Sequence, residues 1–189
     1  MTVGVLALQG AFEKHLQALS QCGVAGRAVR LPQQLDEVAA LIMPGGESTT
    51  IGKLMAAYGF FEALPAFGRR HPIFGTCAGM ILLGRALTDG ERPQPLLGMM
   101  DTVVERNAYG RQVDSFEADL AVPALGEPAL RGVFIRAPRI AAVGPAVEVL
   151  AEHEGSPVLV RQGRLLAASF HPELTADRRL HQYFLSLVT

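Results

Sequence analysis

The stretch HPIFGTCAGMILLG, residues 71–84, joins two apolar runs through Gly75-Thr76-Cys77-Ala78-Gly79. Residues 72–77 are typical of a buried strand and residues 78–87 of a helix. A glycine-x-nucleophile-x-glycine sequence between a strand and a helix is the pattern of a nucleophile elbow, where small neighbours allow a sharp turn. The stretch therefore predicts a strand, a strained turn at Cys77, and a helix whose N-terminus favours the thiolate.

Strand-like and helix-like segments alternate before this turn. Strands are predicted at 3–9, 26–31 and 39–46, the last ending in a turn, and helices at 11–22, 32–38 and 51–70. Alternation of this kind is typical of βαβ units, which build a mostly parallel sheet covered by helices on both faces.

The second half of the chain is richer in strands. They are predicted at 100–107, 115–122, 132–138, 147–155, 157–163 and 164–172, and a last helix at 176–188. Tight connections between these strands predict antiparallel strands added at one edge of the sheet. Residues 1–189 are therefore predicted to form one α/β domain, a three-layer α/β/α flavodoxin-like fold.

Composition excludes several classes of protein. Apolar residues make up 49% of the 189 residues, charged residues 19%, and the net charge is −1, so no nucleic-acid or membrane partner is expected. No apolar run approaches the roughly 20 residues of a membrane span. The first residues, MTVGVLALQG, do not resemble a signal peptide, so Cys22 and Cys77 are expected to be free thiols in the cytoplasm.

A second polar group follows another predicted strand, in Ser169-Phe170-His171-Pro172-Glu173. Because the carboxyl ends of parallel strands meet at one edge of a sheet, we expect His171 near Cys77. Pro172 keeps His171 extended, and the Glu173 carboxylate can hold the imidazole from behind. Together the three side chains predict a thiol activated by a base and a carboxylate.

Taken singly, each of these residues has a plainer interpretation. A free cysteine is often a small core hydrophobe, and a lone histidine is usually structural. The remaining histidines are weaker candidates for the base: His71 precedes its strand, His15 and His181 lie in helical patterns, and His153 lies in a turn.

The loop PGGESTT, residues 44–50, follows a third strand. In the plainer interpretation it is a turn in which Ser48 or Thr49 caps the next helix. The alternative is that the Gly46 backbone N–H, with that of Ala78, stabilises a developing oxyanion.

Other chemistries lack their motifs. The chain has no C-x-x-C or H-x-x-x-H, so no metal is expected, and no dinucleotide fingerprint follows the first strand. The glycine-lysine-serine ending of a phosphate loop is also missing. Acyl transfer through a cysteine thioester remains, without a cofactor.

These motifs resemble the class I, or triad, glutamine amidotransferases. The elbow FGTCAGM at 74–80 and SFHPEL at 169–174 are typical of that superfamily. LALQGAF at 6–12, RNAYGRQVDSFE at 106–117 and FIRAP at 134–138 are similar to one branch, the glutaminase subunits of pyridoxal 5′-phosphate synthase.

The resemblance implies the roles of particular residues. It implies Cys77 as nucleophile, with His171 and Glu173 completing the triad. It also implies that glutamine lies against Gly46, Glu47, Ser48, Arg106, Ile135 and Arg136. Arginine suits the carboxylate of a free amino acid.

The resemblance also implies the reaction and the partner. Glutamine would be hydrolysed to glutamate and ammonia, and the ammonia passed to a (β/α)₈-barrel synthase subunit in a large hetero-oligomer. Two alternatives stay open: the glutaminase of another amidotransferase, such as imidazole glycerol phosphate synthase, or a non-catalytic binding or chaperone module on the same fold.

Overall fold

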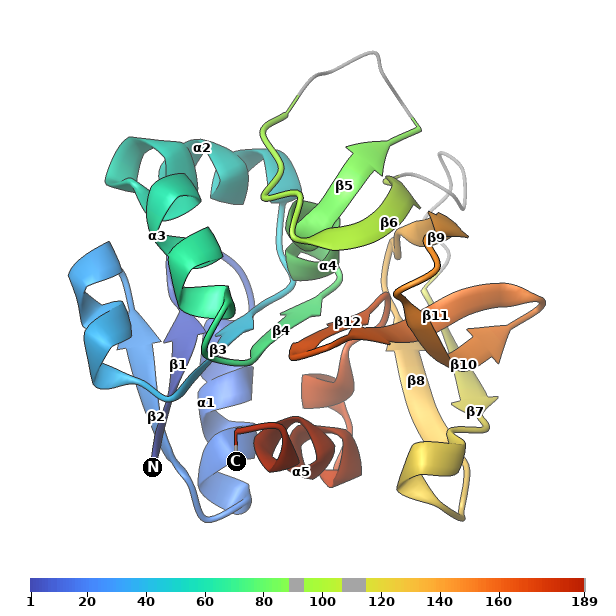
Figure 1. The fold of residues 1–189 in the computed structure, drawn as a ribbon. Helices are drawn as coiled ribbons and strands as arrows, with labels where there is room; N and C mark the ends of the chain where they lie inside the picture. Colours follow the sequence, from blue (N-terminus) through green and yellow to red (C-terminus); the bar gives the residue numbers. More distant parts are fainter. Residues whose placement is uncertain (89–93, 107–114, 189) are drawn as a thin grey trace.

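The structure, a computed structural model, describes residues 1–88, 94–106 and 115–188. A seven-stranded sheet in the order β10-β11-β12-β4-β3-β1-β2 runs through the molecule (Figure 1). The strands from β12 to β2 are parallel, and β11 and β10 extend the sheet antiparallel at one edge. The strands are β1 Thr2–Leu6, β2 Ala25–Val29, β3 Ala40–Met43, β4 Ile73–Thr76, β10 Glu148–His153, β11 Ser156–Gln162 and β12 Leu165–Ala168. This arrangement confirms the predicted mostly parallel sheet with antiparallel edge strands.

Helices cover both faces of this sheet (Figure 1). On one face lie the 3₁₀ helix η1 (Pro32–Glu37), α2 (Ser48–Tyr58), α3 (Phe60–Gly68) and α4 (Ala78–Leu83). On the other lie α1 (Phe12–Gln21) and α5 (Arg179–Ser186). Alternation along β3 divides its side chains between the two cores: Leu41 and Met43 enter the first, and Ile42 the second. Both faces are apolar, as a parallel sheet buried on both sides requires.

Two small sheets correct the prediction for the second half of the chain. Three segments predicted as strands, 100–107, 115–122 and 132–138, lie outside the main sheet: the first belongs to a three-stranded sheet, β5-β6-β9, and the other two form a two-stranded sheet, β7-β8. Their strands are β5 Gly84–Leu87, β6 Met100–Glu105, β7 Phe116–Leu120, β8 Leu130–Phe134 and β9 Arg139–Val143. Along β6 the side chains alternate between buried and partly exposed, the pattern of a sheet with one covered face rather than two.

Two predicted helices are shorter than the sequence pattern suggests. The helix expected over 51–70 divides at Gly59, whose φ of 81° ends α2 in the left-handed conformation before α3 begins. The helix expected over 78–87 ends at Leu83, and Gly84–Leu87 is instead strand β5, paired with β6. The apolar run alone did not distinguish a buried helix from a buried strand.

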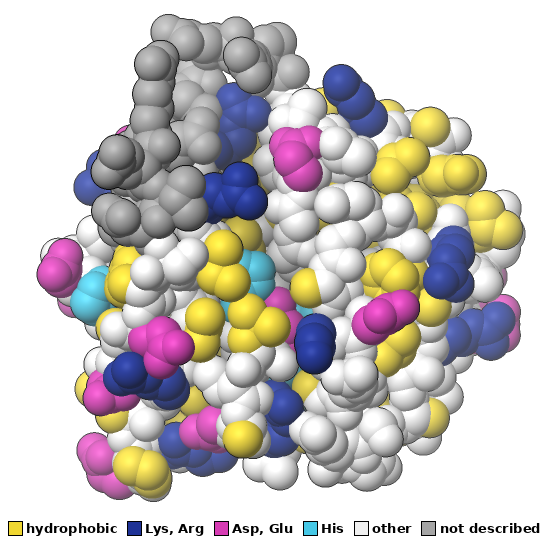
Figure 2. Space-filling view, turned by 180° about the vertical axis from the view of Figure 1, so that it is seen from behind, with side chains coloured by type: hydrophobic (Ala, Val, Ile, Leu, Met, Phe, Trp, Pro, Cys, Tyr) yellow, Lys and Arg dark blue, Asp and Glu magenta, His cyan; other side chains and the backbone are white. Residues whose placement is uncertain are grey.

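The surface agrees with the mixed charge of the sequence. On the face seen in Figure 2, acidic and basic side chains are interspersed, and histidine atoms reach the surface among hydrophobic side chains. No helix within the described part of the chain has the length and apolar character needed to cross a bilayer.

Candidate active site

Cys77 occupies the turn between β4 and α4, as the sequence predicts. Its φ of 50° and ψ of −104° are rarely adopted by residues other than glycine. The turn is held by a hydrogen bond from the Cys77 N–H to the Ala168 carbonyl, 2.8 Å. Gly79 is required here, because a Cβ at that position would lie 2.1 Å from the Met43 carbonyl oxygen. The elbow therefore presents a sulfur at the carboxyl ends of β3, β4 and β12, with 7% of the residue exposed.

His171 and Glu173 form a series of polar side chains beside Cys77. His171 follows β12, and its backbone N–H donates to the Val133 carbonyl at 2.8 Å. Its Nδ1 lies 2.7 Å from Oε1 of Glu173, in the 3₁₀ helix η3 (Pro172–Leu174). Since Nδ1 is engaged with the carboxylate, Nε2 is the ring nitrogen left for Cys77. The two side chains are neighbours, because a Cβ at Gly45 would lie 2.5 Å from Cε1 of His171 and 3.3 Å from Cβ of Cys77. The structure therefore brings together the three side chains that the sequence predicts to meet.

The electrostatics of the series favour a charged His171. Burial would lower the pKa of His171, but its interactions with Cys77 and Glu173 raise that pKa to about 10. Burial would likewise raise the pKa of Glu173, yet the hydrogen bond from His171 and the nearby histidines lower it. Glu173 is therefore a carboxylate, and it stabilises an imidazolium directed at the sulfur.

The loop between β3 and α2 lies directly against this series. A Cβ at Gly45 would be 2.5 Å from Cε1 of His171. The Gly45 carbonyl accepts a hydrogen bond from the Ala11 N–H, 3.0 Å, and the Glu47 N–H donates to Oε1 of Gln9, 2.9 Å. Because the C=O and N–H of a trans peptide point in opposite directions, the Gly46 N–H is directed away from Ala11. The peptides on both sides of Gly46 are thus tied to the loop after β1.

The N-cap of α2 differs from the one suggested by the sequence. The cap is Glu47, whose carboxylate accepts from the Thr49 N–H at 3.0 Å and the Thr50 N–H at 2.7 Å. Ser48 and Thr49, suggested as caps by the sequence, are the first residues of the helix. A glutamate, one bond longer than aspartate, reaches the same amides, and these hydrogen bonds lower its pKa against the opposing effect of burial.

The residues expected to contact glutamine lie in two groups. Ser48 Oγ donates to Oε1 of Gln94 at 3.1 Å, and Nη1 of Arg106 donates to the same oxygen at 2.9 Å. Ile135 and Arg136 follow β8, whose Val133 carbonyl binds the His171 backbone. Arg136 is exposed and has a φ of 42°, a second rare conformation. Gln94, which links Ser48 with Arg106, carries no motif by which the sequence could have identified it.

The sequence makes His15 and His181 weak candidates for the catalytic base, because each lies in a helical pattern. Both are fully buried, and Nδ1 of His15 lies 3.2 Å from Nε2 of His181. Nε2 of His15 lies 3.4 Å from Oε2 of Glu173. The available signal was spacing: His15 falls on the same face of α1 as Phe12 and Leu19, so a core position could have been predicted.

Acid is expected to destabilise the protein through these two histidines. Burial lowers the pKa of His15 to about 4, although Glu173 opposes this, and burial lowers the pKa of His181 to about 3. Between the ordinary histidine pKa of about 6.5 and these values, the unfolded chain binds protons that the folded chain excludes. Stability therefore falls as pH falls from about 6.5 towards 4, by about 1.4 kcal/mol per pH unit for each such proton.

Urea unfolding at pH 7, 6 and 5 measures this slope. The His181→Leu variant should lose about one proton's share of it, because one of the two groups is removed. An unchanged slope in that variant would assign the acid sensitivity to other groups.

The sequence is similar to known proteins over nearly its whole length. A model of the SNO glutamine amidotransferase family matches residues 5–189. Pyridoxal 5′-phosphate synthase subunit PdxT of Desulforudis audaxviator is 58% identical over 189 residues, 100% of this chain and 99% of the relative. The protein of the same name from Thermotoga neapolitana is 50% identical over 189 residues, 100% of each chain.

Solved structures give the same result. One described as a crystal structure of glutamine amidotransferase has a TM-score of 0.93 and 53% identity, and it covers 98% of both chains. PurLQS from Thermotoga maritima has a TM-score of 0.77 at 16% identity, covering 100% of this chain and 98% of the other. At that identity the second likeness supports the fold alone.

Proposed function

Because the chain belongs to the SNO glutamine amidotransferase family, we propose that it hydrolyses L-glutamine to L-glutamate and ammonia as a subunit of pyridoxal 5′-phosphate synthase. The observation that carries this function is Cys77 on a strained elbow, beside the hydrogen-bonded pair of His171 and Glu173. Relatives at 50–58% identity over the whole chain, all named as subunits of that synthase, support it over the other amidotransferases.

The series supplies the groups that the reaction needs. Cys77 attacks the side-chain carbonyl carbon of glutamine as a thiolate, which the neighbouring imidazolium stabilises. His171 then gives its proton to the leaving nitrogen, so that ammonia departs and a thioester remains. A water molecule, losing a proton to His171, attacks the thioester, and glutamate leaves as the thiolate and the imidazolium are restored. Glu173 keeps the Nδ1 proton of His171 in place throughout.

We assign the remaining roles as the family resemblance implies them. The backbone N–H groups of Gly46 and Ala78 would hold the oxyanion, and the position of Gly45 against His171 supports this. Glutamine would lie against Gly46, Glu47, Ser48, Arg106, Ile135 and Arg136. No metal or cofactor takes part in these steps.

Arg106 should report on glutamine recognition. If its guanidinium binds the substrate carboxylate, Arg106→Ala should raise KM and lower kcat/KM by roughly one to two orders of magnitude, the worth of a charged hydrogen bond. Arg136→Ala should act in the same direction. The measurement is steady-state glutamate release over a range of glutamine concentrations.

Arg131→Ala provides the matched control, because Arg131 pairs with Glu117 and Asp119 on the β7-β8 sheet. It should leave KM at the wild-type value. If the Arg106 and Arg136 variants both do the same, neither arginine binds glutamine, and Arg136 becomes a candidate for the interface with the synthase.

We also propose that the isolated chain hydrolyses glutamine weakly until it docks on its synthase partner, a (β/α)₈ barrel. The Gly45–Gly46 peptide can turn over at small steric cost, and one orientation presents an N–H to the oxyanion while the other presents a carbonyl. Turning it over breaks the hydrogen bond from Ala11 to the Gly45 carbonyl. Gain of one oxyanion donor is worth about 10²–10³ in kcat.

Glutamate production with and without the synthase ring tests both the function and this switch. Gly46→Val should abolish activation, because a side chain at position 46 collides with Gln9 and disturbs the loop. Cys77 should still react with an alkylating agent. Gly52→Ala is the control, since a methyl group there makes ordinary contacts in α2. Equal kcat with and without the synthase would contradict the switch. No glutamate production in either condition would contradict the proposed function.

We further propose that residues 1–189 act as one domain in the cytoplasm. The two cysteines, Cys22 and Cys77, are both free thiols, and reactive thiols persist best in a reducing compartment.

A further inference from the structure

A buried polar cluster lies behind the Glu173 carboxylate, on the side away from His171. It consists of His15 from α1, Thr76 from β4 and His181 from α5, each with 0% of the residue exposed. Nε2 of His15 is 3.4 Å from Oε2 of Glu173 and 3.2 Å from Oγ1 of Thr76. Within the described residues, Oε2 of Glu173 is buried and has no hydrogen-bond partner. Nε2 of His15 is a polar atom that faces it.

The Glu173 carboxylate favours one tautomer of His15. A carboxylate oxygen only accepts, so a hydrogen on Nε2 of His15 is attracted to Oε2 of Glu173, 3.4 Å away, and Oγ1 of Thr76, 3.2 Å away, can accept the same hydrogen. Nδ1 of His15 is then bare and accepts from Nε2–H of His181, 3.2 Å away. The donors thus run in one direction, from His181 to His15 and from His15 towards Glu173. The opposite tautomer of His15 would set a lone pair against the carboxylate.

Neutral histidines suit this position. Burial lowers the pKa of His15 and of His181, and Arg178 acts on both in the same direction, whereas Glu173 opposes it. A charged His15 would compete with His171 for the one carboxylate. A neutral N–H can orient Oε2 while the negative charge of Glu173 remains available to the His171 imidazolium.

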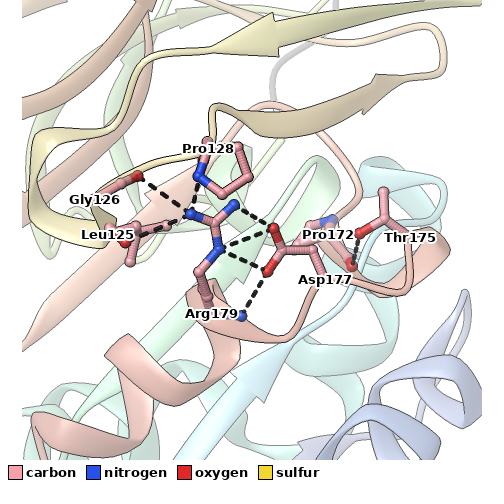
Figure 3. A network of polar contacts seen from close by, with 7 residues as sticks. All are labelled: Leu125, Gly126, Pro128, Pro172, Thr175, Asp177 and Arg179. Atoms are coloured by element: carbon pink, nitrogen blue, oxygen red, sulfur yellow. Dashed lines mark hydrogen bonds and ion pairs between the residues drawn. The ribbon is translucent and has the colours of Figure 1, made fainter.

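The helix that carries His181 is anchored at its start. Figure 3 shows the Arg179 guanidinium between Asp177 and the backbone carbonyls of Leu125, Gly126 and Pro128. Its Nη1 donates to the Pro128 carbonyl at 2.7 Å, and its Nε to Oδ2 of Asp177 at 3.0 Å. His181 follows two residues later, so its ring is held by a fixed helix end rather than by a free surface helix.

We propose that His15 is a positioning residue for glutamine hydrolysis: its Nε2–H orients the Glu173 carboxylate, and His181 holds His15 in the tautomer that does so. The proposal rests on the function proposed above. It adds two residues, from α1 and α5, to a series that would otherwise end at Glu173.

Two substitutions of His15 separate positioning from packing. In His15→Gln the side-chain amide nitrogen reaches the place of Nε2, so the donor towards Glu173 is retained. In His15→Asn the amide reaches only the place of Nδ1, and that donor is lost. With the synthase partner present, His15→Asn should lower kcat roughly ten- to hundredfold at unchanged KM, and His15→Gln should recover most of the loss. His71→Asn, which alters a contact with the Ala39 carbonyl and a ring stacked on Phe67, both away from the triad, should leave kcat unchanged.

A second measurement does not depend on glutamine. The rate of Cys77 alkylation by iodoacetamide, followed against pH in the chain alone, reports how well the His171 imidazolium stabilises the thiolate. The midpoint should rise in His15→Asn and return towards the wild-type value in His15→Gln. If His15→Asn does not fold, the same comparison can be made at His181, the next residue in the series. The midpoint should then rise in His181→Leu and return towards the wild-type value in His181→Gln.

Equal kcat losses in the two His15 variants with an unmoved alkylation midpoint would show that His15 only fills space, and the proposal would be overturned. Wild-type kcat in both would overturn it as well. A wild-type chain that releases no glutamate with the synthase fails the proposed function instead, and the alkylation midpoints still decide the role of His15.

Discussion

Replacing Cys77 with alanine is expected to abolish glutamine hydrolysis and to leave the fold intact. Loss of the nucleophile from a triad lowers kcat by roughly six orders of magnitude, because His171 and Glu173 have no thiol left to activate. The backbone changes little, since alanine enters the same strained turn and removes one sulfur atom from a site that is 7% exposed. Glutamate release with the synthase partner and circular dichroism measure the two parts of this expectation.

Cys22→Ala is the matched control. Cys22 ends α1, is partly exposed, and has a raised pKa because of partial burial. A thiol with a raised pKa is a poor nucleophile at neutral pH, so this variant should keep the wild-type kcat. Full activity in Cys77→Ala would show that the reaction uses another group.

His171 and Glu173 should differ in how much activity their loss removes. His171 transfers a proton in both half-reactions, so His171→Asn should cost about as much as losing Cys77. Glu173→Gln keeps an oxygen 2.7 Å from Nδ1 of His171 but removes the charge that stabilises the imidazolium. By comparison with other triads, it should retain one to two orders of magnitude more activity than His171→Asn.

Single-turnover kinetics with the synthase partner present distinguish these variants. Glu173→Gln should also lower the pKa of His171, because the charge that raises it is gone. The activity of Glu173→Gln should therefore fall further at high pH than at low pH within the range where His171 titrates. A Glu173→Gln variant with wild-type kcat would make Glu173 a structural residue.

Much of the fold could be predicted because its central strands carry an unambiguous pattern. Runs such as ALIM in β3 are apolar at every position, which is typical of a parallel strand covered on both faces. The small sheets were harder to predict. In β9 only Ile140 is buried, and such a strand differs little from a loop until its partner β6 is known. Gly84 likewise gives no sign that its segment pairs with Met100.

The residues of the candidate site likewise include some that the sequence predicts and some that it does not. Cys77 and His171 could be brought together from the sequence because each follows a strand, and strand ends of a parallel sheet meet at one edge. The pairing of His15 with His181 could not, since 166 residues separate them and each looks like an ordinary helix position. Gln94 poses the same difficulty, because it joins Ser48 and Arg106 from a segment without regular structure. Long-range polar contacts of this kind leave no periodicity in the chain.

Covalent labelling by an electrophilic glutamine analogue tests the central claim most directly. The wild-type chain, with its synthase partner present, is treated with the analogue, digested, and mapped by mass spectrometry, with a parallel sample protected by excess glutamine. We predict one modified cysteine, Cys77, whose labelling parallels the loss of glutamate release and is prevented by glutamine. Labelling of Cys22 alone with activity lost, or labelling of Cys77 that glutamine does not prevent, would contradict the assignment of Cys77 as the nucleophile of a glutaminase.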